Sequence, residues 1–291
     1  MKLSRKACAK INLGLRILER MPDGYHAIET VYVELDWGDM LFVEPAEELS
    51  LLCRGIPLPV VEDNLVIRAA RALQRDVQVE QGARITLDKV IPVGSGLGGG
   101  SSDAAAALLL LCELWEAKPG MDSLVGIARS LGADVPFFLE GGTAYATGIG
   151  DMLVPVEWGF DGWVVLFHPE WEVSTPWAYE RWDQLGRMPS SPLPLSDYLD
   201  RLPGDPGFRD LFTNNFESII LEEFPALRNS YDQFWETGAD HVSLSGSGSS
   251  LFGLFSDRDR AALGLQWAQS HGWGCLTRRR TGEFRERGEA G

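Results

Sequence analysis

A glycine-rich loop that runs directly into a helix constrains this chain more than any other segment. Residues 91–107 read IPVGSGLGGGSSDAAAA, with five glycines between Gly94 and Gly100. The alanines and leucines that follow have high helix propensity. Glycine lets backbone N–H groups approach oxygen atoms closely, and the first turn of a helix adds unpaired donors and the positive end of the helix dipole. The segment therefore predicts an anion-binding loop.

A purely structural role, or a different nucleotide motif, fits this loop less well. Ser101 or Ser102 could simply cap a buried helix, but one capping serine does not require so many glycines. No lysine follows the last glycine, which excludes the GxxxxGK[ST] nucleotide loop. The glycine spacing, without an acidic residue on a second strand, also disfavours a dinucleotide-binding fold.

Composition indicates a metabolic enzyme of the cytoplasm. The 291 residues are enough for two domains, no apolar stretch approaches 18 residues, and the first residues lack a signal-peptide core. The four cysteines are isolated, which is typical of reduced cytosolic thiols and gives no metal spacing. A net charge of −16 disfavours a nucleic-acid partner. It also means that any nucleotide site depends on local donors.

In the first half, a strand is expected where Ile11, Leu13, Leu15 and Ile17 alternate with Lys10 and Asn12, placing the latter two on one polar face. Two more strands, 31–35 and 40–43, are predicted on either side of a turn at Gly38-Asp39. Asp63 is expected to cap a helix over 64–74, and Asp122 a helix that ends at Gly132. A strand over 84–87 leads into the glycine loop.

The second half opens with a predicted strand over 163–167, and 188–206 is loop-rich. A helix is expected over 215–236, kinked or broken at Pro225. The glycine–serine segment 243–250 lies between two strand halves, so Gly246 and Gly248 predict a close backbone approach to a ligand or to the glycine loop. A helix over 258–269 and a strand over 273–277 precede a charged end, 278–291.

The order Pro92-x-x-x-Gly96-Leu97-Gly98-Gly99-Gly100-Ser101-Ser102 resembles the phosphate loop of the GHMP small-molecule kinases. Four further segments surround it in order: AKINL from Ala9, DGYH from Asp23, GADVPFF from Gly132 and LSGSG from Leu244. The whole set resembles the members of that family that act on a cytidine diphosphate-linked methylerythritol in the non-mevalonate isoprenoid pathway.

The resemblance implies an α+β fold of two domains. The first, 1–155, would be similar to ribosomal protein S5 domain 2 and would hold ATP. The second, 156–280, would be a ferredoxin-like α+β domain that holds the substrate. The charged, glycine-containing composition of 281–291, and not the resemblance, predicts a mobile tail. The resemblance also implies ATP-dependent phosphorylation of the 2-hydroxyl of the substrate by a monomer or weak homodimer. Mg²⁺ is expected as the ATP counter-ion, held mostly by phosphates and water.

Alternatives come from within the family and from another class. A homoserine- or mevalonate-type kinase, or the related diphosphomevalonate decarboxylase, would not need Tyr25 and His26 as a base-stacking pair. A catalytically silent ligand sensor would be expected to lose Asp134 or to crowd the glycine loop, and neither has happened.

Asp134 and Lys10 are the candidate catalytic residues. Asp134 follows a predicted helix end and precedes Val-Pro-Phe-Phe, so apolar neighbours would exclude bulk water from a proton acceptor. A loop carboxylate that caps backbone amides is the alternative. Lys10, one of only five lysines, could instead be an exposed lysine on an edge strand. The resemblance implies that Asp134 is the base and that Lys10 lies beside it.

The resemblance also implies the binding residues. Tyr25 and His26 would hold the cytosine, with an aromatic from the second domain on its other face. Tyr179 matches that position, and Trp177 is close enough to compete. The predicted substrate contacts are Asn12, Tyr25, His26, Thr175 and Tyr179. His168 is added to them because it precedes Pro169 at the end of a predicted strand. The predicted ATP contacts are Asn64, Pro92, Gly94, Gly96, Leu97, Gly98, Gly99, Gly100, Ser101 and Ser102.

Overall fold

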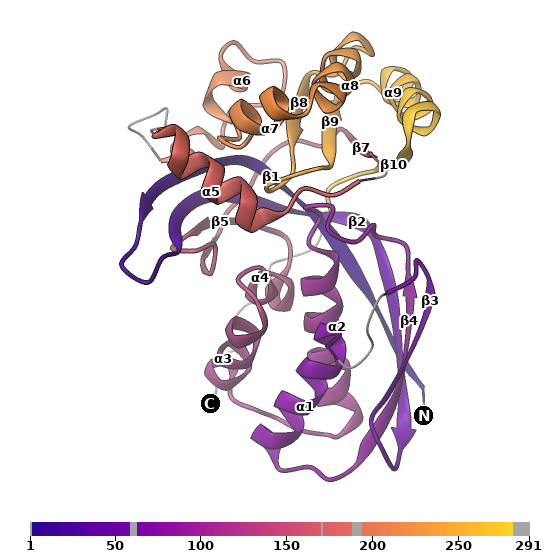
Figure 1. Cartoon of the computed structure of the whole chain (residues 1–291). Coiled ribbons are helices and arrows are strands. Elements are labelled where there is room, and N and C mark those ends of the chain that lie inside the picture. Colours follow the sequence, from indigo (N-terminus) through magenta and orange to yellow (C-terminus); the bar gives the residue numbers. More distant parts are fainter. Residues whose placement is uncertain (1, 59–62, 170, 188–193, 282–291) are drawn as a thin grey trace.

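Two β-sheets with helices packed against them make up the computed structural model, which describes residues 2–58, 63–169, 171–187 and 194–281. A six-stranded sheet contains β1 to β6, and a four-stranded sheet contains β7 to β10 in the order β10-β7-β9-β8. In Figure 1 the first sheet and helices α1 to α4 form the lower part of the molecule, and the second sheet with α6 to α9 forms the upper part.

The strand β2 is the spine of the first sheet. It runs from His26 to Ala46 and pairs along its length with β1, Leu3–Arg20. On its other side it pairs with β4 and β5, and these pair with β3 and β6 respectively. The bounds of these strands are Ser50–Gly55 for β3, Gly82–Lys89 for β4, Thr143–Thr147 for β5 and Met152–Pro155 for β6.

The turn predicted at Gly38-Asp39 was wrong, because β2 continues through it. A Cβ on Gly38 would lie 2.0 Å from the Ala7 carbonyl oxygen of β1. The glycine therefore allows a close approach between two strands where the register of the β1–β2 pair shifts, between Cys8 and Lys10.

Four helices cover the first sheet: α1 is Leu65–Val77, α2 Gly99–Leu114, α3 Met121–Leu131 and α4 Val135–Glu140. Two predicted caps were wrong by one or two residues. Asn64, not Asp63, caps α1, with its Oδ1 accepting from Val66 N at 2.8 Å. Gly120 precedes α3, so Asp122 lies in its first turn, whereas Gly132 ends it as predicted. The alanine-rich α2 is buried on most of its surface, which small side chains permit.

The second sheet carries its own helices. The strands are β7 Trp163–His168, β8 His241–Leu244, β9 Leu251–Phe255 and β10 Trp273–Thr277. The helices are α5 Thr175–Leu185, the short η1 Leu195–Tyr198, α6 Phe208–Leu211, α7 Glu217–Glu223, α8 Pro225–Glu236 and α9 Arg258–His271. The break predicted at Pro225 is confirmed, because proline begins α8 where no N–H partner is needed.

The two sheets share a hydrophobic core. Ile11 and Leu13 of β1 and Val33 of β2 are buried in one cluster with Leu166 of β7 and Phe252 of β9. After β10 the chain returns to the first sheet, where Arg279 bridges to Leu35 and Arg280 N donates to Glu34 O at 2.8 Å. Residues 188–193 and 282–291 lie outside the described residues, so the tail predicted over 281–291 stays a prediction.

Candidate active site

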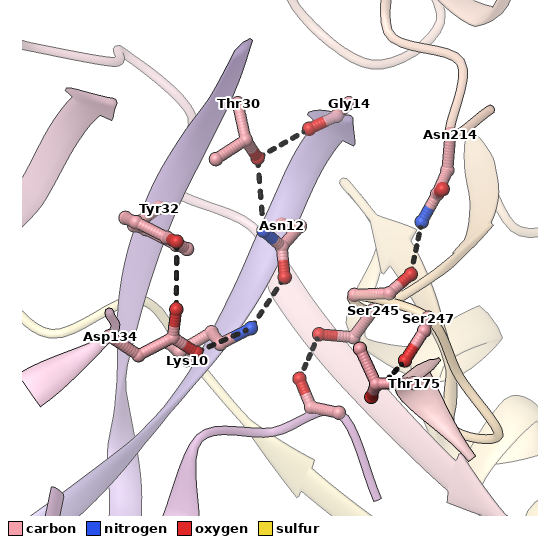
Figure 2. Close-up of polar contacts among 12 residues, drawn as sticks. Lys10, Asn12, Gly14, Thr30, Tyr32, Asp134, Thr175, Asn214, Ser245 and Ser247 are labelled. Atoms are coloured by element: carbon pink, nitrogen blue, oxygen red, sulfur yellow. Dashed lines mark hydrogen bonds and ion pairs between the residues drawn. The ribbon is translucent and has the colours of Figure 1, made fainter. Parts of the chain in front are cut away.

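Lys10 begins a line of fixed polar side chains on β1 and β2 (Figure 2). Its ammonium donates to Asn12 Oδ1 at 2.5 Å, and Asn12 Nδ2 donates to Thr30 Oγ1 at 3.0 Å. The Thr30 hydroxyl donates in turn to the carbonyl of Gly14 at 2.6 Å. Lys10 is only 3 % exposed, so the exposed edge-strand alternative is wrong. The polar face predicted for this strand is therefore a buried row of hydrogen-bonded side chains, which holds the Lys10 ammonium in one position.

Asp134 lies opposite Lys10, at the start of α4. Its Oδ2 is 3.5 Å from Lys10 Nζ, and its Oδ1 accepts from the Tyr32 hydroxyl at 2.8 Å. Burial lowers the pKa of Lys10, and the Asp134 carboxylate opposes that shift. Burial, together with Asp134, raises the pKa of Tyr32 well above its ordinary value, so Tyr32 is a donor to Asp134. The carboxylate is held from two sides, and its side chain keeps 29 % exposure.

That exposed part faces a cavity of about 550 Å³ between the two sheets. Lys10, Asn12, Tyr32 and Asp134 line one end, and Gly96 and Gly98 line a wall. The far end is lined by the β1–β2 turn and α5, with the residues Arg20, Tyr25, His26, Thr175, Tyr179 and Asp183. A charged end and an aromatic end thus belong to one cavity.

The glycine loop separates this cavity from a second one of about 330 Å³. Gly96 and Gly98 line both, and both have left-handed backbone angles, φ +78° and +73°. Gly98 also precedes α2 without any side-chain cap, so the simple serine-cap alternative is wrong. Open backbone of this kind at a helix N-terminus suits phosphate oxygens on both sides of the loop.

The glycine–serine segment of the second sheet holds the loop in place. Ser245 Oγ donates to Gly96 O at 2.9 Å, and Ser250 N donates to Ser95 O at 3.2 Å. A Cβ on Gly96 would lie 2.1 Å from the Ser245 carbonyl oxygen. Asn214 Nδ2 donates to Leu244 O and Gly246 O, which fixes the segment from behind. The segment therefore approaches the glycine loop closely at Ser245. The predicted positions are less close, because a Cβ on Gly246 would lie 3.5 Å from Gly96 O and one on Gly248 would meet only Leu244.

A buried ion cluster supports the second cavity. Lys89 Nζ lies 2.5 Å from Asp39 Oδ2 and 2.7 Å from Asp103 Oδ2, and all three side chains are buried. Burial alone would lower the pKa of Lys89, but Asp103 and Asp39 outweigh it and raise that pKa. Burial also raises the pKa of Asp103, and the Lys89 ammonium opposes that shift. Lys89 and Asp103 line the cavity beside Asn64, Gly100 and Ser101.

At the far end of the first cavity, a histidine lies between two residues of α5. The His26 ring stacks on Tyr179, with 4.8 Å between ring centroids and 15° between planes. His26 Nε2 is 2.7 Å from Asp183 Oδ1. Tyr25 is 63 % exposed at the turn. Trp177 packs edge-on against Phe224 instead of lining the cavity, so Tyr179 is the ring that faces it.

Known proteins match this architecture in sequence and structure. The sequence models described as "GHMP kinases N terminal domain" and "GHMP kinases C terminal" match residues 64–142 and 206–272. The 4-diphosphocytidyl-2-C-methyl-D-erythritol kinase of Chlorobium phaeobacteroides is 42% identical over 272 residues, 93% of this chain and 92% of that protein. That of Chlorobaculum tepidum is 44% identical over 259 residues, 88% and 90% of the two chains. The chain belongs to this family of GHMP kinases.

Solved structures agree. A crystal structure of 4-(cytidine 5'-diphospho)-2C-methyl-D-erythritol kinase has a TM-score of 0.82 and 36% identity, covering 96% of this chain and 100% of that one. A homoserine kinase from Cytophaga hutchinsonii has a TM-score of 0.66 at 20% identity, covering 96% of each chain, which shows a shared fold only. The predicted two-domain GHMP fold is confirmed.

The geometry separates the predicted residues that line the two cavities from those that do not. Lys10 and Asp134 meet, and the predicted substrate contacts Asn12, Tyr25, His26, Thr175 and Tyr179 line the first cavity. His168 does not line it: it is buried, with Nδ1 3.1 Å from Ser250 Oγ, and burial lowers its pKa to about 4.

Most of the predicted ATP contacts line the second cavity, but two do not. The Leu97 side chain is buried in the shared core, and its carbonyl accepts from Lys10 N at 2.9 Å. Ser102 is buried in the first turn of α2, where its N–H donates to Gly98 O. Both support the loop from inside.

Sequence reasoning missed Tyr32, Lys89, Asp103, Arg20 and Asp183. Asp183 had a local signal, because Thr175, Tyr179 and Asp183 are spaced by four residues and share one face of α5. The partners of the others come from distant segments, for which the sequence carries no spacing signal.

Proposed function

We propose that the protein transfers the γ-phosphoryl group of ATP to the 2-hydroxyl of 4-diphosphocytidyl-2-C-methyl-D-erythritol, giving the 2-phosphate and ADP. The observation that carries this proposal is the Lys10–Asp134–Tyr32 group at one end of a cavity whose other end is aromatic. An acceptor alcohol at the charged end and a pyrimidine at the aromatic end fit one elongated substrate. The identities and coverage of the relatives support the same substrate.

In the proposed reaction Asp134 accepts the proton of the hydroxyl. Asp134 lines the cavity, with its Oδ2 beside the Lys10 ammonium and its Oδ1 accepting from the Tyr32 hydroxyl. The hydroxyl oxygen forms a bond to the γ-phosphorus as the bond from that phosphorus to the bridging oxygen breaks, and ADP leaves. Phosphoryl transfer has a loose transition state, so positioning and charge stabilisation supply most of the rate enhancement.

Lys10 supplies positive charge where negative charge develops. Asn12 and Thr30 hold the ammonium in place, so little reorganisation is needed during the reaction. Backbone N–H groups of the glycine loop and the N-terminus of α2 would hold the phosphates of ATP in the second cavity, beside Asn64 and Ser101.

Mg²⁺ would accompany ATP as its counter-ion. Among the described residues, no group of three or more His, Cys, Asp or Glu side chains could hold a metal ion. The hydroxyl of Ser101 is a suitable oxygen donor at the nucleotide cavity, and phosphates and water would supply the other ligands. The ion neutralises phosphate charge when bound.

The remaining proposals concern organisation. We propose an ATP-binding domain over 1–155 and a substrate-binding domain over 156–280, acting as a monomer or weak homodimer in the cytoplasm. No helix within the described parts of the chain is long and apolar enough to cross a membrane. The proposal includes no nucleic-acid partner, since the chain carries a net charge of −16.

A coupled assay of ADP release tests the function. The purified protein is given ATP with the cytidyl substrate, with homoserine or with mevalonate at equal concentrations. Turnover of the cytidyl substrate alone, with the product identified as the 2-phosphate by ³¹P NMR, is the expected result. Comparable turnover of homoserine or mevalonate, or none of the cytidyl substrate, would overturn it.

A further inference from the structure

Asp183 is placed to control His26 from across the cavity. The carboxylate comes from the last turn of the helix α5, and the imidazole lies at the start of β2 in the first sheet. Asp183 Oδ1 lies 2.7 Å from His26 Nε2, and its Oδ2 lies 3.4 Å from Arg20 Nη1. All three residues line the cavity. The contact therefore joins α5 to β2 of the first sheet.

The carboxylate determines which nitrogen of His26 carries the proton. An ionised carboxylate only accepts hydrogen bonds, so the Nε2 beside it must be the N–H. In the neutral ring Nδ1 is then an acceptor, and it has no hydrogen-bond partner among the described residues. The Tyr179 ring, stacked against the imidazole, holds the plane of the ring. The orientation and the tautomer of His26 are thus both fixed by α5.

We propose that Asp183 is a positioning residue for base selection: by holding His26 as the Nε2–H tautomer, it presents Nδ1 as an acceptor for the exocyclic amino group of cytosine. Uracil has a carbonyl oxygen in the place of that amino group, so an acceptor on the protein disfavours it. This inference rests on the proposed function, because it assumes that the base end of the cytidyl substrate lies in this cavity.

The exposure of the three side chains suits such a role. The His26 side chain is 6 % exposed, whereas those of Asp183 and Arg20 are 32 % and 63 % exposed. The proposed hydrogen bond from cytosine to His26 is therefore made at a buried site, where an unmade hydrogen bond costs the most binding free energy. The Arg20 guanidinium lies beside Asp183 and is screened by solvent. We therefore expect Arg20 to contribute less to base selection than Asp183 does.

The first test needs no substrate. The chain has four histidines, so ¹⁵N-labelled protein at pH 8 gives four ring systems, and His26→Gln identifies the signals of His26. We expect wild-type His26 to show a protonated Nε2 and an unprotonated Nδ1. In Asp183→Asn the amide can donate or accept, so both tautomers should appear. An Nδ1–H tautomer in the wild type, or an unchanged spectrum in Asp183→Asn, would overturn the proposal.

The second test measures selection. The ratio of kcat/KM for the cytidyl substrate to that for its uridyl analogue should be roughly 5- to 150-fold in the wild type, the range expected for one unmade buried hydrogen bond. Asp183→Asn should lower that ratio towards 1 by raising the KM for the cytidyl substrate, with the KM for ATP unchanged. Arg20→Gln should lower it less, and Asp183→Glu, which restores a carboxylate, should recover part of it.

Asp232→Asn is the matched control, because Asp232 is an exposed partner of Arg228 on α8, outside the cavity. It should keep the wild-type ratio. If the wild type does not use the cytidyl substrate, the proposed function fails while the tautomer test still decides the role of Asp183. If the wild type uses it and Asp183→Asn keeps both the ratio and the tautomer, only the present inference fails.

Discussion

The two ends of the main cavity are built in different ways. At the end proposed to hold the reacting hydroxyl, Lys10 and Tyr32 project from paired strands, and each contacts Asp134. At the base end, Tyr25 lies on a turn with 63 % exposure, and the His26–Tyr179 stack joins two elements that only tertiary packing brings together. Strand pairing therefore fixes the Lys10–Asp134–Tyr32 group, whereas the His26–Tyr179 contact depends on the packing of α5 against β2.

The largest expected effect is at the reacting end. Asp134→Asn keeps the shape of the side chain and removes the acceptor charge, so kcat should fall by roughly 10²-fold or more while the KM for ATP changes little. Lys10→Met should also lower turnover more than substrate affinity, because it removes the charge near the reacting hydroxyl. Steady-state kinetics measures both. A kcat within about threefold of the wild type in Asp134→Asn would make Asp134 structural.

The glycine loop between the two cavities should show an effect confined to the nucleotide. A Cβ on Gly100 would meet only Leu65, at 3.5 Å, so the fold should tolerate Gly100→Val while the side chain obstructs the second cavity. We expect ATP binding, measured by calorimetry, to weaken by roughly 5- to 150-fold through lost hydrogen bonds. Gly126→Val is the control for the cost of valine in a helix, because Gly126 lies in α3 where an added Cβ would meet no atom of another segment within 4 Å. Equal ATP affinity in the two variants would contradict the phosphate-loop assignment.

The base end should lose substrate affinity without losing turnover. Stacking of a base on an aromatic ring contributes about 1–3 kcal/mol, so Tyr25→Ala and Tyr179→Ala should each raise the KM for the cytidyl substrate by roughly 5- to 150-fold. The KM for ATP should stay nearly unchanged. Trp177→Ala, in the same helix but outside the cavity, is the matched control. A rise in both KM values would indicate a folding defect, and no rise at all would locate the cytidine site elsewhere.

Thermal unfolding of the same variants sharpens the comparison. Tyr25→Ala should change the free energy of unfolding by no more than about 0.5 kcal/mol, because the side chain is largely exposed. Tyr179→Ala should cost more, about 3 kcal/mol, because its ring packs on His26 and Phe216. Equal destabilisation by both variants would mean that Tyr25 is already packed before substrate binds.

A smaller effect is expected from pH. Because burial lowers the pKa of Lys10, its ammonium form is lost below pH 10.5, where an ordinary lysine would still be charged. The alkaline limb of kcat/KM should therefore lie below that pH. Lys10→Arg keeps its charge to about pH 12, so whatever activity remains should show the limb at higher pH. A limb that does not move in Lys10→Arg would assign it to another group.

Local signals in the sequence were enough to predict much of this molecule. The helix break at Pro225 and the bounds of β10 follow from backbone chemistry and alternation within a few residues. The turn predicted at Gly38 was wrong, because sequence alone does not distinguish a glycine that lets two strands approach closely from a glycine that forms a turn. The difference depends on Ala7, which lies 31 positions earlier.

The parts of the site that escaped prediction are pairings across long distances in sequence. Asp39, Lys89 and Asp103 form one ion cluster from three segments, and Asp183 reaches His26 over 157 positions. Each carboxylate alone is compatible with an exposed surface position. Only the packing of α2 on the first sheet, and of α5 over the β1–β2 turn, gives these groups their partners.

The return of Arg279 and Arg280 to β2 makes the second sheet an insertion in topological terms. The chain leaves the first sheet after Pro155, builds the second sheet from Trp163 to Thr277, and comes back to Leu35 and Glu34. Arg280 Nη1 also donates to Glu34 Oε1 at 2.9 Å. A unit attached at both ends cannot exchange with a neighbouring copy unless both attachments open.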